Sequence, residues 1–261
     1  MIILLLFLVG LFVGSFLGVL VDRIPKRKPF IYERSVCDFC KEKLNWYDLI
    51  PVLSFILLRG KCRYCKKTLP LFYPTIELLT GIVYILIYLF ITTIFPFSYL
   101  NLVYYFFICS LLIVIFYIDF KHGIIPDKIL LSAVLATSIY LMVNNLSLIY
   151  IHFFSGVFAS LFFLIISLLY FYFRKKIAMG GGDIKFAFLM GLILGFPGII
   201  VGLYSAFLTA ALYSIILIVW GKKAFLKDSI PFGPFLVLGT FISIFWENLI
   251  FEKALIHLGL L

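Results

Sequence analysis

The sequence predicts an all-α polytopic membrane protein, and both its composition and its apolar segments indicate this class. Hydrophobic residues make up 64% of the 261 residues, charged residues only 13%, and the mean hydropathy is +1.19. A soluble domain has about half apolar and about a quarter charged residues. A membrane-spanning helix needs about 20 apolar residues. We expect about eight such helices, at residues 1–20, 72–95, 100–118, 129–143, 150–173, 184–195, 198–220 and 232–251.

Two of these segments have special features. Residues 1–20 lack a basic start and a small-residue cleavage site, so we interpret them as a retained span rather than a cleaved signal peptide. Residues 184–195 are short for a span, which leaves a tilted helix, a helix partly buried in protein, or a half-span. The run Gly195-Phe196-Pro197-Gly198 is expected to form the turn that ends this segment.

The basic residues predict the orientation. Every lysine and arginine except Lys253 falls in the loop 21–71 or in later loops on the same side, and the opposite loops near 96–99, 144–149 and 195–198 hold none. This asymmetry predicts a cytosolic loop 21–71 and an N-terminus outside. The net charge of +10 is distributed in short loops between apolar segments, which favours anionic lipid headgroups over nucleic acid as the partner.

Four of the five cysteines lie in the loop 21–71, as two C-x-x-C pairs, Cys37 with Cys40 and Cys62 with Cys65. Two such pairs can present four thiolates tetrahedrally to one zinc ion. In a cytosolic loop, structural disulfides are disfavoured. We expect a structural zinc that supplies the folding energy of a loop with little core of its own, with free thiols as the alternative. Cys109, in an apolar segment, is expected to be a packing residue.

Two carboxylates at the edge of the predicted bilayer are candidate catalytic groups. Asp119 ends the third segment, and Asp183 follows three glycines in "MGGGDIKF". Carboxylates beside a bilayer are costly and usually mark function. Two of them can hydrolyse a peptide bond if the ionised one takes a proton from water while the protonated one polarises the carbonyl group. Gly180, Gly181 and Gly182 would tolerate positive φ and let a substrate strand approach Asp183.

Structural explanations of these residues remain open. Asp183 could instead cap a helix that begins at Ile184, and the glycines could form only a hinge. We interpret Asp127, after Pro126, as the turn and cap that opens the fourth segment. Lys185 could stabilise an ionised Asp183 or pair with a lipid phosphate.

Six stretches, in order, make the chain resemble the bacterial prepilin peptidases, the type IV leader peptidases of the GxGD aspartic protease class. They are "GSFLGVLVDRIP" (14–25), "WYDLIPVLSFILLRGKCRYC" (46–65), "YPTIELLTG" (73–81), "DFKHGIIPD" (119–127), "MGGGDIKF" (179–186) and "PFGPFLVLG" (231–239). The resemblance covers nearly the whole chain. One departure is Gly18, which stands where the family commonly has asparagine.

The resemblance implies an enzyme of the inner membrane that removes the leader of type IV prepilins and pseudopilins at the cytosolic face. Asp119 and Asp183 match the catalytic pair, and Gly180–Gly182 and Lys185 are expected to contact substrate. Members with the four-cysteine loop often also methylate the new N-terminus with S-adenosylmethionine. Glu77 is either a snorkelling interfacial charge or a contact for substrate or methyl donor. We therefore expect a first helix at 1–20, a methyltransferase-associated zinc loop at 21–71 and a peptidase domain at 72–261.

Three other functions compete with this interpretation. A transporter would place its carboxylates near mid-span and show inverted repeats. A non-enzymatic assembly protein would use the cysteine loop for docking and would not need the aspartates. An intramembrane aspartyl protease acting on signal anchors would share the GxGD sequence but would not need the cysteine pairs.

Overall fold

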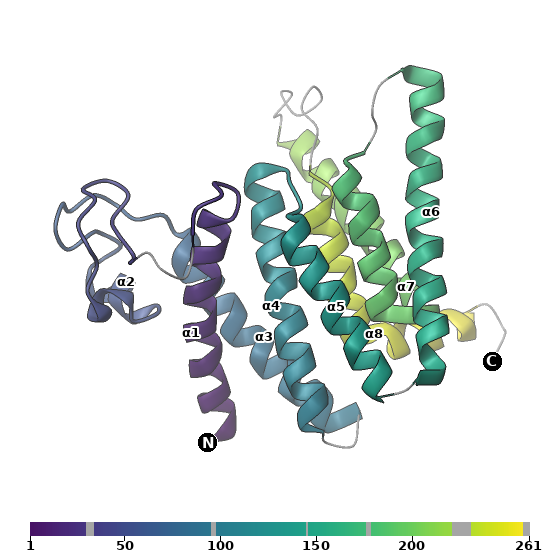
Figure 1. Cartoon of the computed structure of the whole chain (residues 1–261), viewed down its shortest axis with the longest axis horizontal. Coiled ribbons are helices and arrows are strands. Elements are labelled where there is room, and N and C mark those ends of the chain that lie inside the picture. Colours follow the sequence, from purple (N-terminus) through teal and green to yellow (C-terminus); the bar gives the residue numbers. More distant parts are fainter. Residues whose placement is uncertain (30–33, 95–97, 145, 176–178, 221–230, 258–261) are drawn as a thin grey trace. The chain divides into compact units, whose positions relative to one another are not determined.

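The chain folds into helices joined by short connections (Figure 1). The computed structural model describes all residues except 30–33, 95–97, 145, 176–178, 221–230 and 258–261, and within α8 it describes no side chain beyond Trp246. The helices are α1 (Ile2–Arg23), α2 (Leu53–Leu57), α3 (Phe72–Ile94), α4 (Tyr99–His122), α5 (Asp127–Asn144), α6 (Ile149–Arg174), α7 (Gly181–Val219) and α8 (Gly233–His257), with two 3-10 turns at Trp46–Leu49 and Leu146–Leu148.

The predicted all-α membrane class is confirmed. Six helices, α1 and α3 to α7, are long and apolar enough to cross a bilayer, and the residues of α8 up to Trp246 form a further apolar helix. The chain is therefore a multi-pass membrane protein. The predicted segments 184–195 and 198–220 both lie within α7, which is interrupted by non-helical backbone at Gly195 (φ 66°, ψ −167°) and Phe196. The two apolar segments thus follow each other without a loop.

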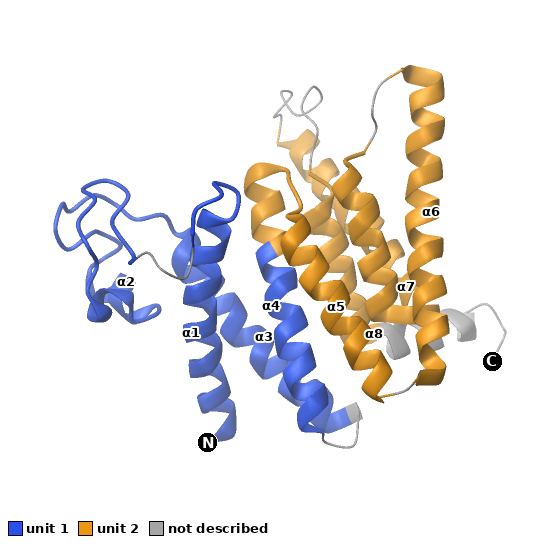
Figure 2. Ribbon diagram, viewed as in Figure 1, with its two compact units in different colours: residues 1–114 blue, residues 115–261 orange. Residues whose placement is uncertain are grey.

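The helices group into two compact units, residues 1–114 and 115–261, which Figure 2 shows in different colours. In the first unit α1 packs on α3. Two glycines permit this packing, because a Cβ atom on Gly10 would lie 2.7 Å from the Cα atom of Gly81, and one on Gly14 would lie 2.7 Å from the Cα atom of Glu77. The two backbones therefore touch directly, as small residues allow between membrane helices.

In the sequence, the cysteine module (residues 34–71) connects α1 to α3. It is built from two matching knuckles, each a tight turn that carries one C-x-x-C pair. In each knuckle the first cysteine donates its backbone N–H to the carbonyl group five residues later, and its own carbonyl group accepts from the lysine after the second cysteine. Those two lysines, Lys41 and Lys66, both adopt positive φ, at 60° and 59°. Each knuckle is also closed by one isolated antiparallel bridge. The four cysteines are thus presented by a structural duplication.

The second unit contains the end of α4 together with α5 to α8. Close backbone packing again relies on glycine: a Cβ atom on Gly191 of α7 would lie within 2.6 Å of the backbone of α6. Phe163 of α6 and Phe186 of α7 are fully buried. Helix α7 therefore packs closely on α6, and it also packs on α8.

Several of the lysines that predict the orientation of the chain in the membrane are not among the residues that the structure describes. Lys176, Lys222, Lys223 and Lys227 are not among the described residues, and the side chain of Lys253 is also outside them. The orientation of the chain in the membrane therefore remains a prediction from the distribution of lysine and arginine in the sequence.

Candidate active site

Asp119 lies at the C-terminal end of α4 with only 4% of its surface exposed. Its Oδ2 atom is buried and has no hydrogen-bond partner among the described residues. The start of α8 covers it: an added Cβ atom on Gly233 would lie 2.5 Å from that oxygen. A buried polar atom without a protein partner is rare in native structures, and this oxygen can accept a hydrogen bond from water or from a ligand.

Asp183 lies in the first turn of α7, so the alternative in which it caps a helix beginning at Ile184 is wrong. The helix begins at Gly181, with Gly180 as the N-cap residue in extended conformation (φ −66°, ψ 143°). The backbone N–H of Gly180 donates to the carboxyl group of Asp183, as an acidic residue at the third helical position can accept from the N-cap. This contact fixes the direction of the side chain.

Ile125 brings the two aspartates into one site. A Cβ atom on Gly182 would lie 3.1 Å from Ile125, and one on Gly233 would lie 3.3 Å from it and 2.5 Å from Asp119. Asp119 is close enough for its charge to act on Asp183. The second unit therefore presents two carboxyl groups side by side, one from the end of α4 and one from the start of α7.

The glycines before Asp183 lack positive φ, and the structure accounts for them by the room that a missing side chain leaves. Positive φ occurs among the described glycines at Gly60, Gly123 and Gly195, and at none of Gly180–Gly182, so that part of the expectation is wrong. Gly182 packs against Ile125, whereas a Cβ atom on Gly181 would meet nothing within 4 Å. The backbone beside Asp183 is therefore accessible from the side on which Gly181 lies.

Lys185 has a partner that the sequence did not suggest. Its ammonium group lies 2.7 Å from Oδ1 of Asp127, the first residue of α5. The two side chains are 55% and 74% exposed. An exposed pair of this kind contributes about 0–1 kcal/mol. In this structure Lys185 thus pairs with the start of α5 at the surface rather than with Asp183.

The four cysteines form one cluster, with all four sulfur atoms within 4.8 Å of one another. A zinc–sulfur bond of about 2.3 Å places two tetrahedral ligands about 3.8 Å apart. The Sγ atoms of Cys37 and Cys65 are 3.9 Å apart. The cluster therefore has the donor set and the spacing that a tetrahedral metal site needs.

The thiols of this cluster influence one another. Burial raises the pKa of the Cys37 thiol, but hydrogen bonds from the backbone N–H groups of Cys40 and Phe39 offset this effect, and the pKa falls to about 7. At Cys40 a backbone hydrogen bond from Glu42 lowers the pKa, but burial and the neighbouring Cys37 and Cys65 raise it to about 11. The Cys37 thiolate therefore forms easily, and its negative charge makes ionisation of Cys40 harder. A bound cation would offset this repulsion between thiolates.

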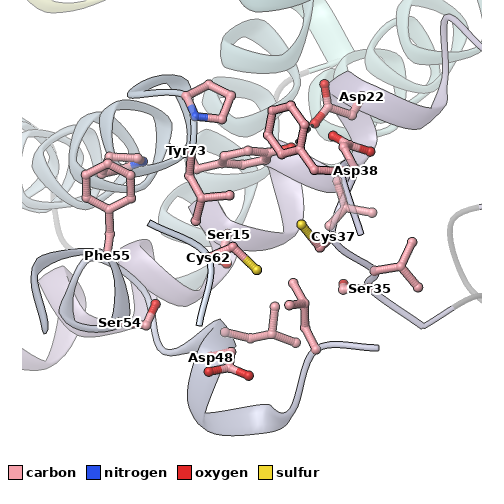
Figure 3. Close-up of a pocket in the computed structure, with 18 of the residues that line it drawn as sticks. Ser15, Asp22, Ser35, Cys37, Asp38, Asp48, Ser54, Phe55, Cys62 and Tyr73 are labelled. Carbon is pink, nitrogen blue, oxygen red and sulfur yellow. Dashed lines mark hydrogen bonds between the residues drawn. The ribbon is translucent and has the colours of Figure 1, made fainter. Parts of the chain in front are cut away.

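Glu77 is buried in the first unit, with 8% of its surface exposed, so the snorkelling explanation is wrong. Its Oε2 atom accepts from the backbone N–H of Val52 at 2.7 Å, and the hydroxyl group of Ser15 also donates to it. Glu77 is among the residues that line a cavity of about 280 Å³. Figure 3 shows this cavity with other lining side chains labelled. The cavity is bordered by the end of α1, the cysteine module, α2 and the start of α3.

Sequence reasoning missed several residues of these sites. Gly233, which covers Asp119, was visible only as part of the motif "PFGPFLVLG". Tyr73, whose hydroxyl group donates to Asp22 at 2.7 Å, likewise lies in a quoted motif. The guanidinium group of Arg23 donates to the carbonyl groups of Pro29 and Arg34.

Comparisons with known proteins match both the N-terminal and the later part of the chain. The family model described as bacterial peptidase A24 N-terminal domain matches residues 8–91, and the model of the type IV leader peptidase family matches residues 106–215. A protein of Vibrio cholerae is 32% identical over 72% of this chain and 76% of its own length. Proteins of Bacillus subtilis and Xanthomonas campestris are 28% and 27% identical over more than nine tenths of each chain. All three are named prepilin leader peptidase/N-methyltransferase. No solved structure matches the chain.

Proposed function

Because the chain belongs to the type IV leader peptidase family, we propose that it is a membrane aspartic endopeptidase that removes the leader of type IV prepilins or pseudopilins. It then methylates the N-terminal amine that cleavage exposes. The observation that carries the first activity is the pair of juxtaposed carboxyl groups, Asp119 and Asp183, in the second unit.

Asp119 and Asp183 are the proposed catalytic residues. The two carboxyl groups share one proton, since two like charges close to one another are unfavourable. The ionised group accepts a proton from the attacking water, and the protonated group polarises the scissile carbonyl and then protonates the leaving amine. The unpartnered Oδ2 atom of Asp119 supports this role, because it leaves a buried acceptor for that water or for the substrate.

The substrate chain is proposed to pass along Gly180, Gly181 and Gly182. The open space beside Gly181 supports this path, as a backbone can approach there without meeting a side chain. Lys185, with its half-exposed head, is a proposed substrate contact at the start of α7. Glu77 belongs to the other unit and is proposed to serve the second activity.

The position of the aspartates favours a peptidase over a transporter. Asp119 lies three residues before the end of α4 at His122, and Asp183 lies in the first turn of α7. Helix ends meet the membrane surface, which is where the polar leader of a prepilin joins its apolar helix. We propose an inner-membrane protein with this site facing the cytosol and the N-terminus outside, as the basic loops favour.

The methylation activity is assigned to the cysteine loop 21–71, and cleavage to the region 72–261. Cys37, Cys40, Cys62 and Cys65 are proposed to hold a structural zinc ion, whose binding would fold the module. S-adenosylmethionine is the proposed methyl donor. It supplies an electrophilic methyl group on a sulfonium, the chemistry that an amine needs to become a secondary amine.

The test is mass spectrometry of a prepilin co-expressed with the wild type and with single variants. We expect the wild type to remove the leader and add one methyl group. Asp119→Asn and Asp183→Asn should each lower cleavage at least a thousandfold while the protein still inserts. Asp127→Asn is the matched control, because Asp127 is exposed and pairs only with Lys185 among the ion pairs of the described residues. Undiminished cleavage by either of the first two variants would remove the proposed mechanism.

A further inference from the structure

The cavity of the first unit contains chemistry that peptide cleavage does not use. Figure 3 shows side chains from α1, the cysteine module, α2 and α3 around one space, among them the sulfur atoms of Cys37 and Cys62. Its volume of about 280 Å³ is at the lower end of small-molecule sites. Two of the four clustered cysteines thus form part of its wall.

The lining carries both signs of charge. Four carboxyl groups face the cavity, those of Asp22, Asp38, Asp48 and Glu77. Four basic groups face it as well, those of Arg23, Lys26, Lys28 and Arg63. Aromatic rings of Phe39, Phe55 and Tyr73 also line the cavity. A lining of this kind suits a ligand that combines an aromatic base, hydroxyl groups and charges of both signs.

Among these carboxyl groups, Glu77 is distinguished by its burial together with its neighbours, whereas Asp38 is exposed to solvent. Asp48 is paired with Arg63 at 2.7 Å, and the hydroxyl group of Tyr73 donates to Asp22. The partners of Glu77 are a backbone N–H and the hydroxyl of Ser15, and no cation lies within ion-pair distance of it among the described residues. Removing a carboxylate from water without a positive partner is costly. The position therefore favours a ligand that brings a positive charge.

The contact with Glu77 also involves strained backbone. Val52, which donates its N–H to Glu77, has φ 58° and ψ −46°, a conformation that β-branched residues rarely adopt. Strain of this kind persists where the surroundings enforce it, and it concentrates at functional sites. Glu77 thus lies where α3 holds the start of α2 against the cavity.

We propose that this cavity binds the sulfonium methyl donor and the new N-terminal amine, and that Glu77 accepts the proton which the amine must lose. The proposal rests on the methylation activity given under Proposed function. Both reactants bring a positive charge, an ammonium and a sulfonium, which matches a buried carboxylate without a cationic partner. Phe55 and Tyr73 would pack against the base of the donor, and the basic side chains would receive its carboxylate.

The reaction balances with groups already named. The ammonium group of the cleaved pilin transfers one proton to the carboxylate of Glu77 and becomes a neutral amine. The nitrogen lone pair then forms the new N–CH₃ bond while the S–CH₃ bond breaks, and the bonding electrons remain on sulfur as a neutral thioether. The product is a methylammonium ion, so the positive charge has moved from sulfur to nitrogen.

The first experiment tests the location by direct binding. S-adenosylhomocysteine, which cannot react, is titrated calorimetrically into the zinc-loaded full chain. Ser54 of α2 lines the cavity, and Ser54→Trp would fill it. Ile56 of the same helix is 64% exposed and does not line the cavity, so Ile56→Trp is the matched control. We expect Ser54→Trp to weaken binding at least tenfold and Ile56→Trp to change it less than twofold, with leader cleavage retained by both.

The second experiment tests the role of Glu77. Glu77→Gln keeps an acceptor for the N–H of Val52, and we expect it to bind S-adenosylhomocysteine within about threefold of the wild type. Methylation of a pre-cleaved pilin peptide should fall at least a hundredfold at pH 7, the contribution typical of a general base. The loss should shrink as the pH rises past about 8, because an N-terminal amine then loses its proton to water. A structural role of Glu77 would give a loss that does not depend on pH.

The outcomes separate this inference from the proposed function. If the wild type methylates and Ser54→Trp binds the probe as the wild type does, the donor site lies elsewhere and only the inference fails. A pH-independent loss in Glu77→Gln would remove the proton-acceptor role. If the wild type cleaves leaders but never methylates them, the second activity itself fails, and the inference fails with it.

Discussion

Gly233→Ala should impair cleavage without unfolding the protein. The added Cβ atom would lie 2.5 Å from Oδ2 and 2.9 Å from Cγ of Asp119, whereas ordinary contacts begin at 3.4 Å. The carboxyl group must therefore retreat by about 0.9 Å. It can do so by rotating, since it is the end of a side chain with no hydrogen bond to break at Oδ2. A misplacement of about 1 Å costs roughly 100-fold in rate, or about 2.7 kcal/mol of transition-state stabilisation.

The assay is the rate of leader removal from a synthetic prepilin by the purified protein in detergent, followed by mass spectrometry. Methylation of a pre-cleaved peptide by the same sample reports whether the first unit is intact, and it should remain within about twofold of the wild type. Gly18→Ala provides the control for adding a methyl group to a helix, because its Cβ atom would meet Ile76 at an ordinary 3.6 Å. If Gly233→Ala cleaves at the wild-type rate, the carboxyl group of Asp119 does not act from the position described.

Four further outcomes are expected. Gly181→Ala should raise KM for the prepilin several-fold with little change in kcat, since its Cβ atom enters open space that the substrate is proposed to occupy; equal losses in both constants would contradict this. Lys185→Ala should change the rate of cleavage less than about fivefold, because its ion pair with Asp127 is exposed. Cleavage kinetics at low salt provide the check, and a larger loss there would contradict this prediction. Gly14→Ala should lower the free energy of unfolding by about 1–3 kcal/mol, as overpacked sites do, and Gly18→Ala should not, when the two are compared by thermal unfolding. Removing zinc with a chelator should abolish methylation and leave cleavage within about twofold, because the cysteine cluster lies in the first unit and the two aspartates lie in the second; spectroscopic titration of a cobalt-substituted sample would follow the metal.

The sequence predicts well those features that are determined by the type and spacing of residues. Apolar length locates the membrane helices, although it divides the single helix α7 into two segments, and the two cysteine pairs predict the cluster that the structure forms. Asp119 and Asp183 were singled out because a carboxylate beside a bilayer is costly. Their assignment to catalysis remains a prediction, which the proximity of the two residues supports.

Features that depend on close packing between distant segments could not be predicted in this way. The role of Gly233 depends on α8 reaching the end of α4, more than one hundred residues away in the sequence. The burial of Glu77 depends on Val52 and Ser15, which come from two other elements. The glycines before Asp183 show the same limit. The sequence predicts positive φ for them, whereas the structure shows that Gly182 packs against Ile125, a contact that cannot be predicted from local sequence.

The direct contact between the backbones of α1 and α3 makes the cysteine module exchangeable. Gly10 and Gly14 hold the two helices together independently of whatever connects them. The ends of the connection are therefore already positioned, and the entropy of closing a loop between them changes only slowly with its length. In evolution or in protein engineering, the module could shrink to a short turn or be replaced by another domain, and the helical pair on which it stands would persist.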